Sequence, residues 1–242
     1  MVFYIIGIGL ADEKDITLKG LEAVKKCREV FLESYTSKLQ CSVSDLENFY
    51  NKKIKIADRE LVEKKADEIL KDNNCLLIIG DPMSATTHID LYNRAKEKGL
   101  VVEVIHNASI LTAVGIVGLE LYKYGKTTSI PFHNENVKTP IDVIKMNLKN
   151  GLHTLVLLDL DPINNKFMTI GEAAEYLLKN KVKEINEETI AIGCAAIGSK
   201  KQIIKAGKLS ELKKFEVKEF PQCIIIPGKL HFVEEEMIEK WR

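Results

Sequence analysis

The sequence predicts an α/β protein with two domains, an N-terminal parallel sheet covered by helices and a C-terminal mixed α+β sheet. In the first half, short apolar runs alternate with segments whose apolar residues recur at helical spacing, which is typical of βαβ units. After Gly125 the apolar runs cluster with little helix between them, which indicates a second kind of sheet. We therefore expect domains at residues 1–110 and 111–242, with a ligand cleft between them.

The composition is that of an ordinary soluble protein. The chain has 242 residues, and its 35 Lys and Arg balance its 35 Asp and Glu. This balance gives no field that would attract nucleic acid or an anionic membrane, and no apolar run approaches the ~20 residues that span a bilayer. The five cysteines form no Cys-x-x-Cys pair and the five histidines are dispersed. We therefore expect no metal site and a location in the reducing cytoplasm, without a secretion signal.

The first βα unit opens the chain. Residues 3–8 form an apolar strand that runs into Gly-Ile-Gly-Leu at residues 7–10, and Thr17 can cap the following helix. A Gly-x-Gly turn is compatible with a nicotinamide-dependent dehydrogenase, in which Glu33 would hold a ribose. That alternative is the less favoured one, because Asp12 stands where the third glycine of the dinucleotide fingerprint belongs and the loop is long.

The other elements follow from periodicity, caps and turn residues. In the first half we expect strands at residues 30–33, 75–79 and 101–105 and helices at residues 43–49, 58–70, 83–98 and 110–121. In the second half we expect strands at residues 127–130, 154–158, 189–196, 202–206 and 223–226 and helices at residues 140–148, 170–179 and 232–241. The helix at residues 170–179 carries a capping box, Thr169-x-x-Glu172, and Asn164-Asn165 predicts a turn.

The strand at residues 75–79 and the Gly80-Asp81-Pro82 turn after it form the central stretch. Pro82 fixes its own φ and disfavours the α region for Asp81, so Asp81 is held extended at the carboxyl end of the strand. Ligands bind at that end in open α/β sheets. The alternative is structural, with Asp81 as a helix cap and Pro82 at the first helical position. The small side chains at residues 84–87 favour a ligand close to the backbone.

Other strand ends offer similar groups. They are found at residues 9–10, 107–110, 158–159, 193–196 and 227–231 and are mostly backbone, small or apolar. Such groups suit an adenosyl ligand held between two domains. The sequence has no Ser/His/Asp or Cys/His arrangement and no Gly-x-Ser-x-Gly elbow, so hydrolysis is not indicated and we assign no catalytic residue.

These motifs give the whole chain a resemblance to the diphthine synthase family, S-adenosylmethionine-dependent methyltransferases with the tetrapyrrole methylase-like fold. Gly-x-Gly and Gly-Asp-Pro alone indicate only that superfamily. Ala-Thr-Thr-His at residues 85–88 and Pro-Gly-Lys-Leu-His at residues 227–231 narrow the resemblance. The compact length is similar to that of the archaeal members.

The resemblance implies an activity and a site. The enzyme would be a homodimer that trimethylates the amino group of 3-amino-3-carboxypropyl-histidine on elongation factor 2. The implied cofactor-binding residues are Leu10, Asp81, Ser84, Ser109, Ile110, Leu158, Ala195 and His231. Cys194 is an alternative to Ala195, and Lys229 is a candidate, on position alone, for the substrate carboxylate. A tetrapyrrole or corrin methyltransferase of the same fold and a non-catalytic partner of the translation factor remain as alternatives.

Overall fold

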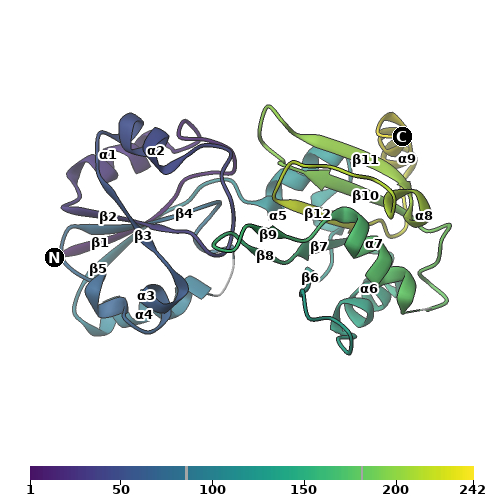
Figure 1. Ribbon diagram of the computed structural model, residues 1–242, viewed down its shortest axis with the longest axis horizontal. Coiled ribbons are helices and arrows are strands. Elements are labelled where there is room, and N and C mark those ends of the chain that lie inside the picture. Colours follow the sequence, from purple (N-terminus) through teal and green to yellow (C-terminus); the bar gives the residue numbers. More distant parts are fainter. Residues whose placement is uncertain (85–86, 181) are drawn as a thin grey trace. The chain divides into compact units, whose positions relative to one another are not determined.

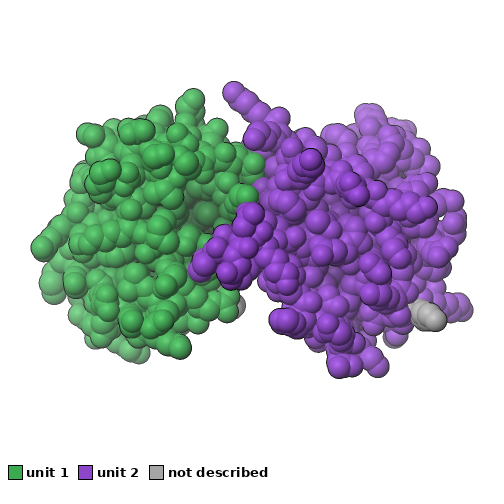
Figure 2. Space-filling view, in the orientation of Figure 1, with its two compact units in different colours: residues 1–111 green, residues 112–242 purple. Residues whose placement is uncertain are grey.

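The computed structural model describes residues 1–84, 87–180 and 182–242 (Figure 1). The chain divides into two compact units, residues 1–111 and residues 112–242, which Figure 2 draws in green and purple. Within the described residues, no helix has the length and apolar character that a membrane crossing requires.

Unit 1 contains a five-stranded sheet in the order β3-β2-β4-β1-β5, and all of its strand pairs are parallel. The strands are β1 (Val2–Gly7), β2 (Glu29–Glu33), β3 (Ile54–Ala57), β4 (Asn74–Ile78) and β5 (Val101–Ile105). The helices are α1 (Leu18–Lys26), α2 (Val43–Tyr50), α3 (Arg59–Glu63) and α4 (Thr87–Glu97), with a 3-10 turn at η1 (Ala66–Glu68). Helices α1 and α2 cover one face of the sheet, and α3 and α4 cover the other (Figure 1).

Two hydrophobic clusters explain why β1 and β4 are continuous apolar runs. Successive side chains of a strand point to opposite faces, and here both faces are covered. Ile6 of β1 and Leu77 of β4 pack into the cluster on the α1 and α2 side, whereas Ile5 and Leu76 pack into the cluster on the α3 and α4 side. The expected parallel α/β sheet is therefore confirmed.

Three local expectations for unit 1 and the region after it are wrong, and one strand was missed. Strand β3 was not expected from the sequence, and the helix expected at residues 58–70 is divided into α3 and η1. Residues 83 and 84 form a turn and not the start of the expected helix, and helix α4 is described from Thr87. The apolar run at residues 110–121 is not one helix, because it consists of α5 (Ile110–Ala113) and the 3-10 turn η2 (Val114–Val117), followed by η3 (Leu121–Lys123).

Gly118 accounts for the break in that apolar run. Its φ is +88°, in the left-handed region that favours glycine, and it ends η2. A Cβ at this position would lie 2.5 Å from the Cβ of Met237, so no larger residue fits between η2 and the C-terminal helix.

Unit 2 contains the mixed sheet that the sequence predicts, and its five strands lie in the order β11-β10-β12-β7-β6. Its strands are β6 (Thr128–Ile130), β7 (Thr154–Leu158), β10 (Ile190–Ala195), β11 (Ile203–Lys208) and β12 (Gln222–Ile226), and only β6 and β7 among them pair in parallel. Its helices are α6 (Thr139–Lys149), α7 (Ile170–Lys179), α8 (Leu209–Leu212) and α9 (Phe232–Lys240), and a small hairpin is formed by β8 (Leu160–Asp161) and β9 (Lys166–Phe167). The capping box of Thr169 and Glu172 is confirmed, since each side chain bonds the backbone N–H of the other residue.

Candidate functional site

The carboxyl ends of β1, β4 and β5 lie at one edge of the unit 1 sheet, because the three strands are neighbours and parallel. The two glycine turns interlock there, since the Gly80 N–H donates to the Gly9 carbonyl at 2.7 Å. A Cβ at Gly80 would lie 3.9 Å from Leu10 and 3.9 Å from Ser109. The structure therefore brings Leu10, Ser109 and the Gly80-Asp81 turn together, around a space that a side chain at Gly80 would fill.

Asp81 joins two of these strand ends. One carboxylate oxygen accepts from the Met83 N–H at 2.8 Å, and the other accepts from the Asn107 N–H at 3.0 Å and from His106 Nδ1 at 2.8 Å. The structural alternative, in which Asp81 caps the next helix, is wrong, because residues 82–84 directly after it form a turn and not a helix. Asp81 instead fixes its own turn and ties that turn to the end of β5.

The pKa of Asp81 is lowered from its ordinary value. Burial opposes ionisation of this side chain, but the N–H groups of Met83 and Asn107 and the ring of His106 stabilise the carboxylate more strongly. Asp81 is therefore an ionised, mostly buried acceptor at the edge of the sheet.

Asn107 and Asp15 also hold the strand ends, and the sequence analysis did not assign them this role. The Asn107 side-chain amide donates to the carbonyls of Gly7 and Asp15, both at 3.0 Å. The Asp15 carboxylate accepts from the N–H groups of Leu10 and Ala11 at 3.1 and 2.7 Å. An Asn or Asp beside a glycine turn was the only signal for these contacts, and it also fits a simple cap.

The other predicted residues of unit 1 lie near the same edge. Ser84 is exposed, and its N–H donates to the Asp81 carbonyl at 3.3 Å. Ser109 is buried, and Ile110 is the first residue of α5. The predicted Ala-Thr-Thr segment falls on residues 85 and 86, which lie outside the described residues, and on Thr87, whose side chain is not described.

In unit 2 the predicted residues lie at opposite ends of the strands of the sheet. Leu158 and Ala195 end β7 and β10 beside the first residues of β12, since Leu157 pairs with Cys223 and Ala195 pairs with Gln222. His231 follows the other end of β12, which spans five residues, or ~13 Å. The structure therefore brings Leu158 and Ala195 to one end of the strands and His231 to the other end.

Cys194 and Ala195 are both fully buried, on opposite faces of β10. A Cβ at Gly193 would contact Ile170 of α7. Ala195 is two residues further along the strand, so its side chain points to the same face of the sheet as that Cβ. Cys194 lies opposite Cys223, and contact with that thiol, together with burial, raises the pKa of Cys194. Cys194 is therefore a neutral thiol directed at its partner, and the choice between Cys194 and Ala195 stays a prediction.

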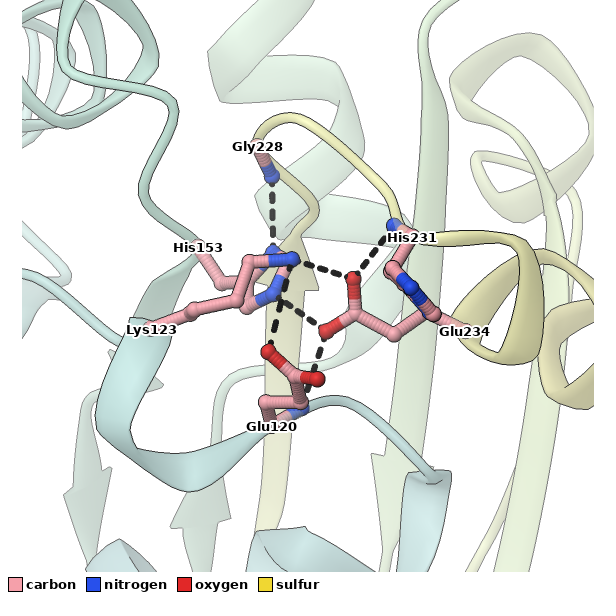
Figure 3. A network of polar contacts seen from close by, with 6 residues as sticks. All are labelled: Glu120, Lys123, His153, Gly228, His231 and Glu234. Carbon is pink, nitrogen blue, oxygen red and sulfur yellow. Dashed lines mark hydrogen bonds and ion pairs between the residues drawn. The ribbon is translucent and has the colours of Figure 1, made fainter.

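A buried polar network surrounds Glu234 of α9 (Figure 3). Glu234 is 1% exposed. Its carboxylate accepts from the N–H groups of Glu120 at 2.9 Å and His231 at 2.8 Å, and it also binds Lys123. His153 Nε2 completes the set at 3.0 Å. Sequence reasoning missed this network, because its members are spread over residues 120–234 and each alone is unremarkable.

The protonation of His153 follows from its partners. Nδ1 accepts from the Gly228 N–H at 2.9 Å, so the proton of the neutral ring is on Nε2, which donates to Glu234. Burial lowers the pKa of His153, although Glu234 opposes this effect. Burial would raise the pKa of Glu234, but Lys123 and the N–H groups of Glu120 and His231 lower it to about 2.

These values predict a pH dependence of stability. The pKa of Glu234 is lowered from 4.5 to about 2, so its contribution of about 3 kcal/mol is complete above the ordinary value and is lost as the pH falls towards 2. We expect the difference in unfolding free energy between wild type and Glu234→Gln to shrink over that range. Urea denaturation at several pH values measures it, and a difference that stays constant from neutral to acidic pH would contradict the assignment.

The networks around Asp81 and Glu234 can hold and orient backbone segments. Among the described side chains, no group of three or more His, Cys, Asp or Glu is placed to hold a metal ion. The edge of unit 1 offers backbone groups, small residues and one ionised carboxylate. Such a site can bind a ligand closely against the glycine backbone.

Comparison with known proteins defines the class. The chain belongs to the tetrapyrrole (corrin/porphyrin) methylase family, whose model matches residues 2–213. It is therefore a methyltransferase, and the dehydrogenase alternative is left without support.

Within that family the relatives are diphthine synthases. The chain is 46% identical to diphthine synthase from Methanocaldococcus jannaschii over 96% of each chain. It is 44% identical to diphthine methyl ester synthase from Dictyostelium discoideum, over 100% of this chain and 98% of the relative. A crystal structure of diphthine synthase has a TM-score of 0.92 at 36% identity, over 100% of this chain and 96% of the other. The resemblance inferred from the motifs is therefore confirmed.

Proposed function

We propose that this protein transfers methyl groups from S-adenosylmethionine to the amino group of 3-amino-3-carboxypropyl-histidine on elongation factor 2, giving a trimethylated product. The observation that carries the proposal is the full-length similarity to diphthine synthases, at 46% identity with the M. jannaschii protein. A tetrapyrrole substrate is less favoured, because the relatives with this similarity carry the diphthine name.

The unit 1 edge supports the cofactor assignment. The space above Gly80 is bounded by Leu10, Ala108 and Ser109, each 3.9 Å from a hypothetical Cβ, and it could take part of an adenosyl group. We propose that Leu10, Asp81, Ser84, Ser109 and Ile110 bind the cofactor from unit 1. From unit 2 we propose Leu158, Ala195 and His231.

The cofactor supplies a methyl group already activated by its sulfonium. The protein's task is then to align amine, methyl and sulfur and to exclude water. An α-amino group has a pKa of about 8, so its deprotonation near neutral pH costs roughly 1–3 kcal/mol, and no dedicated base is needed. We propose Lys229, which is exposed on the loop before α9, as a contact for the substrate carboxylate.

The product of the reaction tests the proposal directly. Incubation with the aminocarboxypropyl-modified factor and excess S-adenosylmethionine is expected to give a trimethylated peptide by mass spectrometry, because transfer can continue until the nitrogen has no lone pair. An unmodified factor would leave a non-catalytic partner of the factor as the better interpretation. Methylation of a free tetrapyrrole instead would favour the alternative substrate.

A methyl ester is the second candidate product. It is favoured by the 44% identity to the D. discoideum protein, whose name describes an ester. Mild alkaline hydrolysis distinguishes the two products, because an ester methyl group is released and the N-methyl groups stay. Since relatives with both names have similar identities, the archaeal type expected from the chain length stays a prediction.

Asp81→Ala is expected to weaken S-adenosylmethionine binding. The substitution releases the Asn107 and Met83 N–H groups and costs about 1–3 kcal/mol of stability, so the turn moves relative to the end of β5. Calorimetry measures the affinity. The matched control is Asp58→Ala, which removes only the cap of α3. If Asp81→Ala binds the cofactor as well as this control does, Asp81 has a structural role alone.

The remaining expectations concern the protein in solution. We propose a homodimer on the strength of the family resemblance, and sedimentation equilibrium would measure it. The balanced charge supports the absence of nucleic acid and membrane partners, and a cytoplasmic location would agree with a translation factor as substrate.

A further inference from the structure

The loop at residues 227–231, which joins β12 to α9, is tied at both ends to a single pair of side chains. The Gly228 N–H donates to His153 Nδ1 at 2.9 Å, and the His231 N–H donates to Glu234 at 2.8 Å. His153 Nε2 and Glu234 are themselves joined at 3.0 Å (Figure 3). One chain of three hydrogen bonds therefore connects the start of the loop to its end.

The middle of the loop is fixed as well. The Lys229 N–H donates to the Gly151 carbonyl at 3.1 Å. A Cβ at Gly228 would lie 2.4 Å from the Leu152 carbonyl oxygen, so the backbone passes directly over the segment before β7. In contrast, the side chains of Lys229 and His231 are exposed. The backbone of the loop is thus fixed by contacts with the segment before β7, whereas the side chains of Lys229 and His231 are available to a ligand.

Glu234 also ties the loop to a second segment. Lys123 of η3 and the N–H of Glu120 bind the same carboxylate. His153 is 0% exposed and Glu234 is 1% exposed, so neither can contact a ligand that binds at the surface. Any effect of this pair on ligand binding must therefore pass through the backbone that it holds.

We propose that His153 and Glu234 are positioning residues for S-adenosylmethionine: they set the backbone of the loop at residues 227–231 so that His231 contacts the cofactor. The inference rests on the proposed function, and in particular on His231 as a cofactor contact. It extends the site from the residues that touch the cofactor to a buried pair that the sequence analysis did not identify.

The first test uses Glu234→Gln and His153→Gln in the full chain. Gln at 234 cannot accept from every donor that the carboxylate holds. Gln at 153 can donate to Glu234 through its NH2 group, but both of its polar atoms are bonded to Cδ, so no acceptor occupies the position of Nδ1 opposite the Gly228 N–H. We expect calorimetry to show S-adenosylmethionine binding at least about tenfold weaker, or ~1.4 kcal/mol, for each variant. If Glu234→Gln does not fold, His153→Gln carries the test.

The matched control is Asn147→Ala. Asn147 is 1% exposed, and its side chain donates to the Lys126 carbonyl and to Thr154 Oγ1 and makes no described hydrogen bond to residues 227–231. We expect this variant to lose stability but to keep its affinity. Amide hydrogen exchange gives a second readout, in which Gly228 and His231 exchange faster in the positioning variants and not in the control.

A double-mutant cycle with His231→Ala completes the test, because a residue that acts only through His231 adds nothing once His231 is removed. We expect Glu234→Gln with His231→Ala to bind as His231→Ala does. Additive losses, unchanged affinity of His231→Ala, or positioning variants that bind like the Asn147 control would each overturn the positioning role while wild-type binding upholds the proposed function. A wild type that binds no S-adenosylmethionine would overturn the proposed function, and the positioning role with it.

Discussion

Replacement of Glu234 by alanine is expected to lower the free energy of unfolding of unit 2 by about 3–5 kcal/mol, because it removes one partner from a buried ion pair. Two backbone N–H groups and His153 Nε2 would lose their acceptor, and the Lys123 ammonium would keep its ion pair with Glu120 but lose Glu234. Each unpaired buried donor adds its own desolvation cost. This is one of the two largest effects that the structure predicts.

The single tryptophan of the chain reports this transition. Trp241 follows α9, and its indole N–H donates to the Val117 carbonyl at 3.0 Å, so its fluorescence senses the contact between α9 and η2. Urea denaturation followed at this residue gives the free energy. The control is Glu235→Ala, an exposed neighbour on α9, for which we expect a change within about 0.5 kcal/mol. Equal effects of the two substitutions would mean that the network contributes little.

Gly9→Ala is expected to have the second large effect, a loss of about 2–5 kcal/mol in unit 1 together with loss of cofactor binding. Gly9 has a φ of +79°, and a Cβ there would lie 2.4 Å from the Cβ of Asp15. The carbonyl of Gly9 also accepts from Gly80, so a shift of this turn would move the Gly80-Asp81 turn with it. Both strand ends of the proposed cofactor site would be displaced.

Gly99→Ala is the matched control for that prediction. Gly99 has a similar φ of +74°, but nothing lies within 4 Å of a Cβ there. It should therefore cost only the left-handed backbone conformation, about 1–2 kcal/mol, and leave cofactor binding intact. Hydrogen exchange of the β1 and β4 amides measures stability, and calorimetry measures affinity. Similar results for the two alanine variants would show that the contact between Gly9 and Asp15 yields at little cost.

The polar networks around Asp81 and Glu234 differ in what they can contact. In unit 1, Asp81 and Asn107 hold three strand ends together at one edge of the parallel sheet. In unit 2, Glu234 is surrounded by protein donors and is buried, so it cannot contact a ligand. The first network is therefore suited to contact with the cofactor and the second to support of a loop, although both depend on a low-pKa carboxylate that accepts backbone N–H groups.

Much of the fold was determined by the sequence alone. The continuous apolar runs of β1 and β4 predicted strands, and the run of β4 is typical of a strand in a sheet that is covered on both faces. Thr169 and Glu172 predicted the start of α7, since a capping box depends on residues that are close in sequence. The motifs at the strand ends likewise predicted the family, and with it the residues near Gly80 that the parallel sheet brings together.

Only the tertiary structure decided the contacts between distant residues. Local patterns favoured a helix start after Pro82 and a continuous helix through Gly118, but Asp81 is held by the end of β5, and Met237 leaves no room for a side chain at Gly118. His153 and Glu234 lie 81 residues apart, so no spacing rule could pair them. Folding buries these distant groups side by side, and this burial gives them their hydrogen-bond partners and shifts their pKa values. Such contacts are a property of the folded chain.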